Sequence, residues 1–251
     1  MRVSIVVPVL HVEPQLERTI ERLARIRDRL DLEILIVVDV PAATREEEVR
    51  AENDRIAERA VAKVRYRVGE RGFGSALRDG FAWATGDVVI PFMADACDDS
   101  RDIPKLVAKA LEGWDVVAGS RYMRGGRIVG NTLKQRLSRF YSLLTRLVGG
   151  PKIHDVTNAF KAYRHGVLES VETVADSYDI SVELTVKAYR AGFSVTEVPT
   201  TWTNRTLGES NWRFSDELKR YPRWLVLAAR GRRASRTNAQ ALSTSRPTED
   251  R

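Results

Sequence analysis

Short runs of β-branched and other apolar residues alternate with amphipathic or charged stretches through the first half of the chain. The apolar runs lie at 3–9, 34–39, 64–68, 88–92 and 116–118. Between the first two runs, Leu16, Ile20 and Leu23 begin the three-or-four spacing of an amphipathic helix over 16–30, and 45–63 predicts a second, charged helix. Strands that alternate with helices predict an α/β fold, a mostly parallel sheet with helices on both faces.

The carboxyl ends of parallel strands meet at one edge of such a sheet, and ligands bind there. Polar or glycine-rich segments follow the predicted strands. They include His11, Asp39, the loop after Val68, Asp95 and residues 120–122. We therefore expect these segments to share one rim of the sheet.

The pattern changes after residue 123. Two amphipathic helices, a strand-like segment and a basic, aromatic-rich helix are predicted at 132–150, 180–192, 194–204 and 216–233. The polar composition after 234 predicts a disordered tail. We divide the chain into a domain at 1–212, a basic amphipathic helix at 213–233 and a tail at 234–251.

Composition limits the class of protein. The chain has 251 residues, 43% of them hydrophobic, which suffices for one large single-core domain. A net charge of +7 predicts anionic partners, such as a nucleotide or a phospholipid surface, or simply a basic soluble protein. A single cysteine, Cys97, excludes a disulfide framework and fits the cytoplasm. No apolar run approaches the roughly 20 residues that span a bilayer, so we expect at most peripheral membrane attachment.

The stretch FMADACDDS, at 92–100, places Asp95, Asp98 and Asp99 directly after a predicted strand. Magnesium and manganese prefer oxygen ligands, and they bind through one or two carboxylates together with substrate phosphates. The alternative is a solvated turn in which Asp99 or Asp102 caps the next helix. Asp95 lies too early to be that cap.

Two further segments admit both a phosphate site and an ordinary loop. Gly72 and Gly74 follow the third predicted strand, where glycines permit either close approach to a phosphate or a tight turn. Arg121, Arg124 and Arg127 lie in a glycine-rich segment that suits either an anionic site or a basic surface loop.

Taken in order, these segments resemble the family 2 glycosyltransferases, and within them the dolichol- or polyprenyl-phosphate mannosyltransferase-like proteins. The similarity covers about 3–212. It is carried by SIVVPVL, IVVDV, RGFGSALRDGFAWATGDVV, FMADACDDSRDIPKLV, VVAGSRYMRGG, DVTNAFKAYR, ISVELTVKAYRAGFSVTEVPTTW and NRTLGESNW. The resemblance implies the GT-A fold, a Rossmann-like nucleotide-sugar-binding domain.

The resemblance also implies a metal site. The second aspartate of the family's D-x-D motif falls on Asp95, whereas Met93 replaces the first. We therefore expect Mg²⁺ or Mn²⁺ on Asp95 and Asp98, with Asp99 as the alternative to Asp98.

Matching positions imply the remaining site residues. Those for the nucleotide sugar are Pro8, Leu10, Glu13, Asp39, Gly72, Gly74, Ala94 and Asp95. Arg121, Arg127 and Lys134 are assigned to an acceptor phosphate, and Arg205 to the donor phosphates. Asp95, Arg121 and Arg205 form the expected catalytic set, and Glu183 is expected to be structural or orienting.

The implied reaction is inverting, metal-dependent transfer of mannose or glucose, from GDP-mannose or UDP-glucose, to a polyprenyl or dolichyl phosphate. A lipid phosphate is already an anion, whereas a sugar hydroxyl needs a carboxylate base, for which Asp179 is the one candidate. The alternative is therefore a family 2 glycosyltransferase with a saccharide or small-molecule hydroxyl acceptor. A third hypothesis is a non-catalytic nucleotide-binding protein. Nucleic acid is not an expected partner, because the basic residues are not interleaved with aromatic ones.

The helix predicted at 216–233 combines Tyr221, Trp224, Leu225 and Leu227 with arginine and lysine. Such a helix suits an anionic membrane surface or a membrane-protein partner. The alternative is a final helix that packs on the domain and exposes a basic end.

Overall fold

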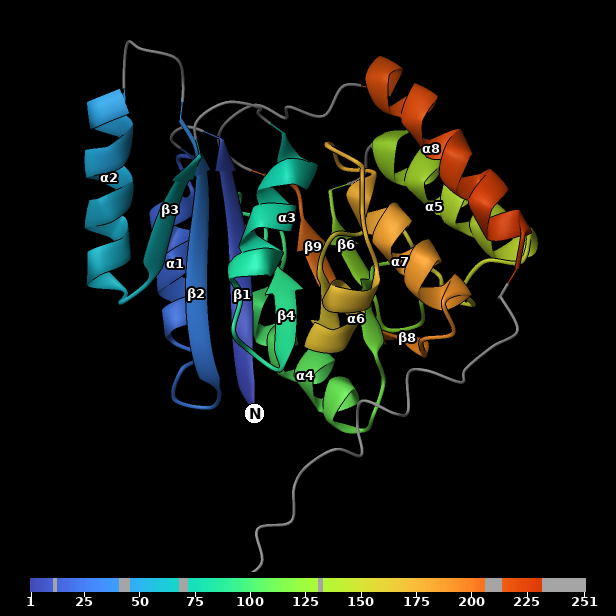
Figure 1. Cartoon of the computed structure of the whole chain (residues 1–251), viewed down its shortest axis with the longest axis horizontal. Helices are drawn as coiled ribbons and strands as arrows, with labels where there is room; N and C mark the ends of the chain where they lie inside the picture. Colours follow the sequence, from blue (N-terminus) through green and yellow to red (C-terminus); the bar gives the residue numbers. More distant parts are fainter. Residues whose placement is uncertain (11–12, 41–45, 68–71, 131–132, 206–213, 232–251) are drawn as a thin grey trace, which may run out of the picture.

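The computed structural model describes residues 1–10, 13–40, 46–67, 72–130, 133–205 and 214–231. These residues form a seven-stranded sheet of order β3-β2-β1-β4-β7-β5-β8 and a two-stranded sheet of β6 and β9 (Figure 1). The strands are β1 (Arg2–Leu10), β2 (Asp31–Asp39), β3 (Lys63–Arg67), β4 (Val88–Pro91), β5 (Val116–Ser120), β6 (Arg127–Val129), β7 (Lys161–Arg164), β8 (Val195–Pro199) and β9 (Thr201–Thr203). The helices are α1 (Leu16–Ala24), α2 (Glu46–Arg59), α3 (Phe73–Trp83), the 3₁₀ helix η1 (Ser100–Asp102), α4 (Ile103–Leu111), α5 (Leu133–Leu147), α6 (His165–Ser170), α7 (Ile180–Arg190) and α8 (Phe214–Ala229).

The predicted parallel sheet is confirmed, with one exception. β1 pairs in parallel with β2 and β4, β2 with β3, and β5 with β8. β7 runs antiparallel between β4 and β5, and the sequence pattern did not predict it. The first predicted helix is shorter than 16–30, because α1 ends at Ala24 and turns lead into β2.

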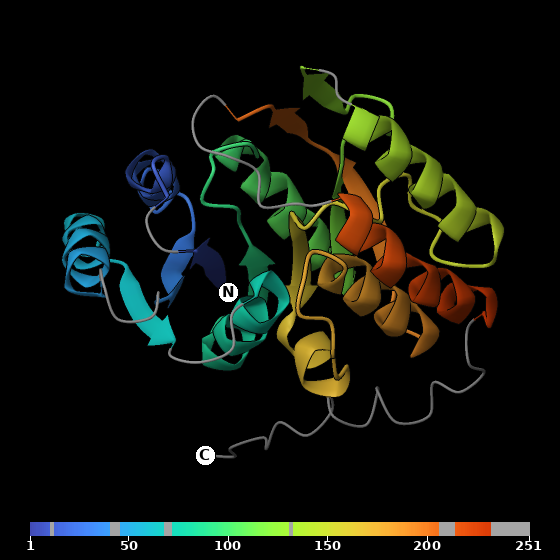
Figure 2. The same ribbon diagram turned by 90° about the horizontal axis from the view of Figure 1, so that it is seen from above.

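Helices cover both faces of the large sheet, as expected (Figure 2). On one face, Leu16, Val49 and Leu106 bring α1, α2 and α4 into one apolar core. On the other face, side chains of α3, α6, α7 and α8 form a second core. Alternate residues of the central strands enter the two cores, since successive side chains of a strand point to opposite faces.

The carboxyl ends of β1, β2, β4 and β5 lie at one edge of the sheet, the upper edge in Figure 1. Asp39, Asp95 and Arg121 therefore follow the sheet at one rim, as the sequence predicts. His11 and 68–71 lie outside the described residues, and so does the tail predicted at 234–251.

Helices α5 and α8 pack side by side next to α7 (Figures 1 and 2). Tyr141 of α5 meets Tyr221 of α8 edge to face, with ring centroids 5.0 Å apart. Arg190 at the end of α7 donates to the carbonyl oxygen of Leu227 at 2.9 Å. Pro222 lies inside α8 rather than at its start, and Trp224 is buried, so this helix is part of the folded domain. Within the described ranges, no helix has the length and apolar character needed to cross a membrane.

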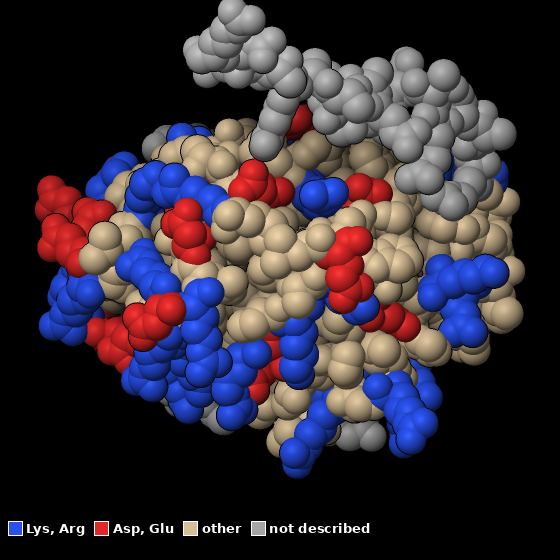
Figure 3. Space-filling view, turned by 90° about the horizontal axis from the view of Figure 1, so that it is seen from below, with Lys and Arg blue, Asp and Glu red and all other residues tan. Residues whose placement is uncertain are grey.

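Basic side chains crowd the lower left of Figure 3, on the side of the molecule where α1 lies. Arg18, Arg25 and Arg101 lie close to Arg22, and partial burial together with these three cations lowers the pKa of Arg22. The positive charge of the chain is thus not confined to the carboxyl-end rim.

Glu33 generates a prediction about stability. Burial alone would raise the pKa of Glu33, but hydrogen bonds from Ser4 (2.6 Å), from the amide and hydroxyl of Thr85 and from Lys63 lower it from 4.5 to about 2. Because the folded state holds the ionised form, this stabilisation is present above pH 4.5 and is lost as the pH falls toward 2. We expect Glu33→Gln to lower the free energy of unfolding by about 1–3 kcal/mol at pH 7.

Urea denaturation of both proteins between pH 7 and pH 3 measures this effect. The difference between Glu33→Gln and the parent should narrow as the pH falls. A difference that is constant over this range would contradict the assignment.

Candidate active site

The acidic loop, residues 92–100, is held between α1 and β9. The amide of Asp99 donates to the carbonyl oxygen of Thr201 at 3.2 Å. The amide of Thr203 donates to the carbonyl oxygen of Cys97 at 2.9 Å. Asp98 and Trp202 form an antiparallel bridge. On the other side, the Thr19 hydroxyl donates to the carbonyl oxygen of Ala94 at 2.9 Å. The loop is therefore fixed by backbone contacts on both sides.

The three aspartates of this loop have different surroundings. Asp95 and Asp98 are buried and line a common pocket. Asp99 instead caps η1 by accepting from the Arg101 amide at 3.0 Å, and it pairs with the Arg101 guanidinium. Of the two aspartates between which the sequence left the second metal position, Asp98 lies in the pocket with Asp95, and Asp99 does not line it.

Asp98 has an incomplete set of contacts. Its Oδ1 is buried without a hydrogen-bond partner among the described residues. Burial, reinforced by the charge of Asp95, raises the pKa of Asp98 to about 8. Two neighbouring carboxylates, one of them with an unpartnered oxygen, fit the donor set of a hard divalent cation. Met93 also lines the pocket, but its thioether is a poor ligand for such a cation.

Protein ligands alone would not complete that cation's shell. Within the described ranges, no group of three or more His, Cys, Asp or Glu residues is placed to hold a metal ion. Asp95 and Asp98 therefore suit the arrangement in which substrate phosphates supply the remaining ligands.

The pocket has a volume of about 720 Å³ and two kinds of lining. Polar side chains from the rim of the sheet and from the start of α5 include Asp95, Asp98, Arg121, Lys134, Asn158 and Arg205. Apolar and aromatic side chains from α5 and α8 include Leu137, Phe140, Tyr141, Leu144, Tyr221 and Leu225. A ligand with an anionic group and an apolar portion matches this division.

Arg205 follows β9 and lies against the acidic loop. Its Nη2 donates to Asp95 Oδ2 at 2.7 Å. Glu13 lies near this pair, and burial raises the pKa of Glu13 although Arg205 opposes the shift. Burial, with Asp95 next in effect, raises the pKa of Cys97, which therefore stays a packed thiol.

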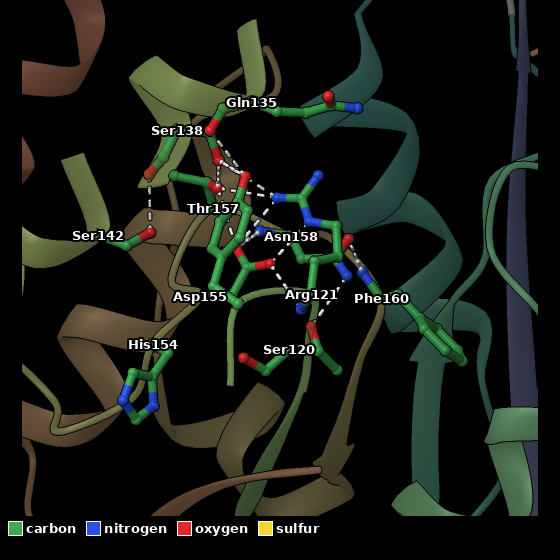
Figure 4. A network of polar contacts seen from close by, with 12 residues as sticks. Ser120, Arg121, Gln135, Ser138, Ser142, His154, Asp155, Thr157, Asn158 and Phe160 are labelled. Carbon is green, nitrogen blue, oxygen red and sulfur yellow. Dashed lines mark hydrogen bonds and ion pairs between the residues drawn. The ribbon is translucent and has the colours of Figure 1, made fainter. Parts of the chain in front are cut away.

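Arg121 follows β5 and lies in the pocket wall, where it is tied to Asp155 (Figure 4). Its Nε donates to Asp155 Oδ2 at 2.7 Å and its Nη2 to Asp155 Oδ1 at 3.0 Å. Asp155 lies in the DVTNAFKAYR segment that carries the family resemblance, but sequence reasoning assigned it no role. The pairing of Asp155 with Arg121 could not be identified from spacing, because the two residues are 34 positions apart.

The other two residues assigned to an acceptor phosphate, Arg127 and Lys134, differ in whether they line the pocket. Lys134, at the start of α5, lines the pocket with Arg121. Arg127 is exposed on β6 and is not among the lining residues. The structure therefore brings two of the three predicted cations together.

Most residues assigned to the nucleotide sugar lie at the rim but outside this pocket. Pro8 and Leu10 belong to β1, and Ala94 is buried under α1. Asp39 accepts from Arg67 Nη1 at 2.6 Å and from the Gly72 amide at 3.1 Å. From this group, only Asp95 is among the lining residues.

Close packing constrains both Gly72, which precedes α3, and Gly74, which lies in the first turn of α3. A Cβ on Gly72 would lie 2.4 Å from the carbonyl oxygen of Asp176, and one on Gly74 would lie 2.2 Å from that of Ala175. The amide of Gly74 also donates to the Asp176 carbonyl oxygen at 2.9 Å. Close approach of the 175–176 backbone thus explains both glycines, with or without a phosphate nearby.

Two carboxylates of the α7 region have structural contacts. Asp179 is buried, and its Oδ2 accepts from Trp224 Nε1 at 2.8 Å and from Arg223 Nη2 at 2.7 Å, which anchors α8. It is not a lining residue of the pocket, so its candidacy as a base for a hydroxyl acceptor weakens. Glu183 accepts from the amides of Val174 and Ala175, which is a structural role.

Comparison with known proteins gives one family match and two informative relatives. The family model described as Glycosyl transferase family 2 matches residues 4–172. A dolichol-phosphate mannosyltransferase of Pyrococcus furiosus is 32% identical over 213 residues, which cover 84% of this chain and 59% of that protein. A polyprenol monophosphomannose synthase of Mycolicibacterium smegmatis is 35% identical over 154 residues, which cover 59% of this chain and 58% of that protein. In both cases the match spans less than two thirds of the relative's length.

Solved structures share the fold at low sequence identity. Glucosyl-3-phosphoglycerate synthase of Mycobacterium tuberculosis, in complex with Mn²⁺, UDP-glucose and phosphoglyceric acid, has a TM-score of 0.66 at 18% identity, covering 92% of this chain and 81% of that one. The same enzyme with Mg²⁺ and UDP has a TM-score of 0.65 at 18% identity, covering 92% and 80%. These likenesses establish the GT-A fold; the synthase itself is bound to Mn²⁺ in one structure and to Mg²⁺ in the other.

Proposed function

The chain belongs to glycosyl transferase family 2, and we propose that it transfers a hexose from a nucleotide-diphosphate sugar to a polyprenyl phosphate, with inversion at the transferred carbon. The observation that carries this proposal is the division of one pocket into a charged part and an apolar part. Relatives named for mannose transfer to dolichol phosphate or polyprenol phosphate support the same acceptor class.

On the donor side, Asp95 and Asp98 would hold Mg²⁺ or Mn²⁺, and Arg205 is placed beside them by its 2.7 Å contact with Asp95. When bound, such a cation neutralises charge on a departing diphosphate. Arg205 supplies a fixed positive charge at the same place, so that the charge which develops on the leaving group meets preorganised partners. The names of the relatives favour GDP-mannose as donor, and the structural neighbours favour UDP-glucose.

On the acceptor side, Arg121 and Lys134 line the charged part of the pocket and would bind the lipid phosphate. The phosphate is already a nucleophilic anion, so no side chain must remove a proton from it. The apolar part of the pocket, with Leu137, Phe140 and Leu144, would take the first isoprenoid units. Arg127 lies outside the pocket, and we leave it out of this assignment.

A lipid acceptor requires contact with a membrane, and α5 and α8 offer a suitable surface. Leu133, Phe140 and Leu147 of α5 are 70%, 58% and 71% exposed, and Val226 of α8 is 59% exposed. Exposed basic residues flank them on both helices, namely Lys134, Arg136, Arg139, Arg146, Lys219, Arg220 and Arg230. Apolar side chains bordered by cations favour binding at an anionic lipid interface. The sequence indicated this role for α8 alone, and the exposed face of α5 extends it.

Acceptor specificity tests the function. We expect labelled hexose from GDP-mannose or UDP-glucose, supplied with Mn²⁺, to appear on polyprenyl phosphate in detergent micelles, and not on the matching polyprenol or on free saccharides. Thin-layer chromatography of the organic phase measures the product. Transfer to saccharides at a comparable rate would instead support the hydroxyl-acceptor alternative.

Metal dependence should rest on two of the three loop aspartates. We expect Asp95→Ala and Asp98→Asn each to lower Mn²⁺-dependent turnover by more than about 100-fold, because a preorganised charge that stabilises a leaving group contributes about 3–4 kcal/mol. Chelation with EDTA should give a similar loss in the parent. Asp99→Asn is the matched control, since Asp99 contacts Arg101 outside the pocket, and its turnover should stay within a few-fold.

Membrane attachment is tested by flotation of the full chain with vesicles that contain anionic lipid. Leu133→Glu together with Leu147→Glu should abolish co-flotation, since each change places a charge in the apolar face of α5. Val174→Glu is the control, because Val174 is 57% exposed but belongs to the segment between α6 and α7 and to neither α5 nor α8. Equal flotation of the α5 variant and the control would contradict the assignment of this surface.

A further inference from the structure

Arg121 is held by an unusually complete set of contacts for a residue that lines a pocket (Figure 4). Three of its N–H groups donate to Asp155: the backbone amide at 3.1 Å, Nε at 2.7 Å and Nη2 at 3.0 Å. The paired nitrogen and oxygen contacts form the bidentate geometry that fixes the plane of a guanidinium. Asp155 thereby determines the direction in which the rest of the guanidinium points.

Asp155 is poorly suited to proton transfer, because both of its carboxylate oxygens already accept hydrogen bonds. Besides Arg121, it accepts from the Thr157 hydroxyl at 3.1 Å and from the Asn158 amide at 3.2 Å, and it is fully buried. Burial raises the pKa of Asp155, but Arg121 outweighs that effect, so the pKa lies below its ordinary value. An ionised, fully hydrogen-bonded carboxylate orients its partner and is a poor base.

The segment that contains Asp155 is itself fixed to the sheet and to α7. Asn158 Nδ2 donates to the carbonyl oxygen of Gly119 at 2.9 Å, one of the last residues of β5. The buried Lys161 Nζ donates to the carbonyl oxygens of Val156 at 2.8 Å and Ser181 at 3.1 Å. These contacts leave Asp155 little freedom to shift with Arg121.

Helix α5 completes the arrangement through Ser138. The Ser138 hydroxyl accepts from Arg121 Nη2 at 3.3 Å and from the Tyr122 hydroxyl at 2.8 Å, and it lies 2.5 Å from Thr157 Oγ1. Figure 4 shows the remaining guanidinium nitrogen, Nη1, without a dashed line and directed away from Asp155. Since Arg121 is a lining residue, Nη1 is the atom available to a ligand in the pocket.

We propose that Asp155 is a positioning residue for acceptor binding: it fixes Arg121 so that Nη1 meets the phosphate of the lipid, with Ser138 as a weaker support from α5. This inference rests on the proposed function, because it takes the anion in the pocket to be a prenyl phosphate. It assigns Asp155 no direct contact with the reacting atoms.

The test measures binding of farnesyl phosphate to the full chain by calorimetry, with farnesol as the uncharged control and with GDP and UDP plus Mn²⁺ as donor-side probes. We expect Asp155→Asn to weaken farnesyl phosphate binding by about 100-fold, the loss that a misplaced binding group typically causes. Affinity for farnesol and for the nucleotides should change by less than about twofold, which a general loss of structure would not allow.

Ser138→Ala provides a second, milder variant, since Asp155→Asn leaves a buried guanidinium without its ion pair and risks unfolding. We expect it to weaken farnesyl phosphate binding by about three- to tenfold, the value of one hydrogen bond. Ser142→Ala is its matched control: Ser142 is buried one turn further along α5, where its hydroxyl donates to the carbonyl oxygen of Ser138 and accepts from the Val156 amide at 3.3 Å, and neither bond involves the side chain of Arg121 or Asp155. The control should bind farnesyl phosphate as the parent does.

The outcomes separate this inference from the proposed function. If the parent chain binds farnesyl phosphate no better than farnesol, the pocket does not recognise the phosphate, and both proposals fail. A parent that prefers the phosphate, with that preference intact in Asp155→Asn or equally reduced in Ser138→Ala and Ser142→Ala, overturns the positioning role alone. Lost turnover with unchanged farnesyl phosphate affinity in Asp155→Asn would place the role of Asp155 in the transfer step rather than in acceptor binding, and would also overturn the positioning role.

Discussion

Backbone pairing between the acidic loop and β9 is the constraint on which the site depends. Residues 97–99 bond to 201–203, so segments about a hundred positions apart in the chain form one rigid unit. Because Arg205 follows β9 directly, this pairing also places its guanidinium on Asp95. Asp102 adds a further link by accepting from the Thr201 amide at 2.8 Å. The acidic loop and the segment that carries Arg205 are thus held together by main-chain hydrogen bonds, which do not depend on side-chain rotamers.

The buried ionisable groups of the pocket wall differ in how completely their hydrogen bonds are satisfied. Arg121 and Asp155 satisfy each other, which a buried ion pair requires if it is not to cost several kcal/mol. Asp98 remains incompletely satisfied, with a raised pKa and an unpartnered oxygen. Among the carboxyl groups that line the pocket, Asp98 thus combines an unpartnered buried oxygen with a raised pKa, a combination that is frequent at functional sites.

The sequence predicted the elements whose signals are local, and missed those that depend on distant contacts. The apolar runs located β1 to β5, and strand ends located the acidic loop and Arg121, because parallel strands share a rim. It missed β7 (Lys161–Arg164), a strand of 4 residues with a basic residue at each end that pairs with β4 and β5. It missed Asp155 for the same reason. The sequence offered a phosphate site or a tight turn as the reason for Gly72 and Gly74, and the 175–176 backbone that approaches both glycines was not visible in it.

The carboxylates of the pocket also bear on the choice of acceptor. Among the lining residues, which belong to the described part of the chain, Asp95 and Asp98 are the acidic side chains. If both hold the cation, neither can remove a proton from a hydroxyl, and Asp179 is already bonded to Trp224 and Arg223. A hydroxyl acceptor needs such a base, whereas a phosphate needs a fixed cation and an apolar path for its chain. Arg121 and the α5 side chains provide both, so the arrangement of charge favours an acceptor that enters the pocket as an anion.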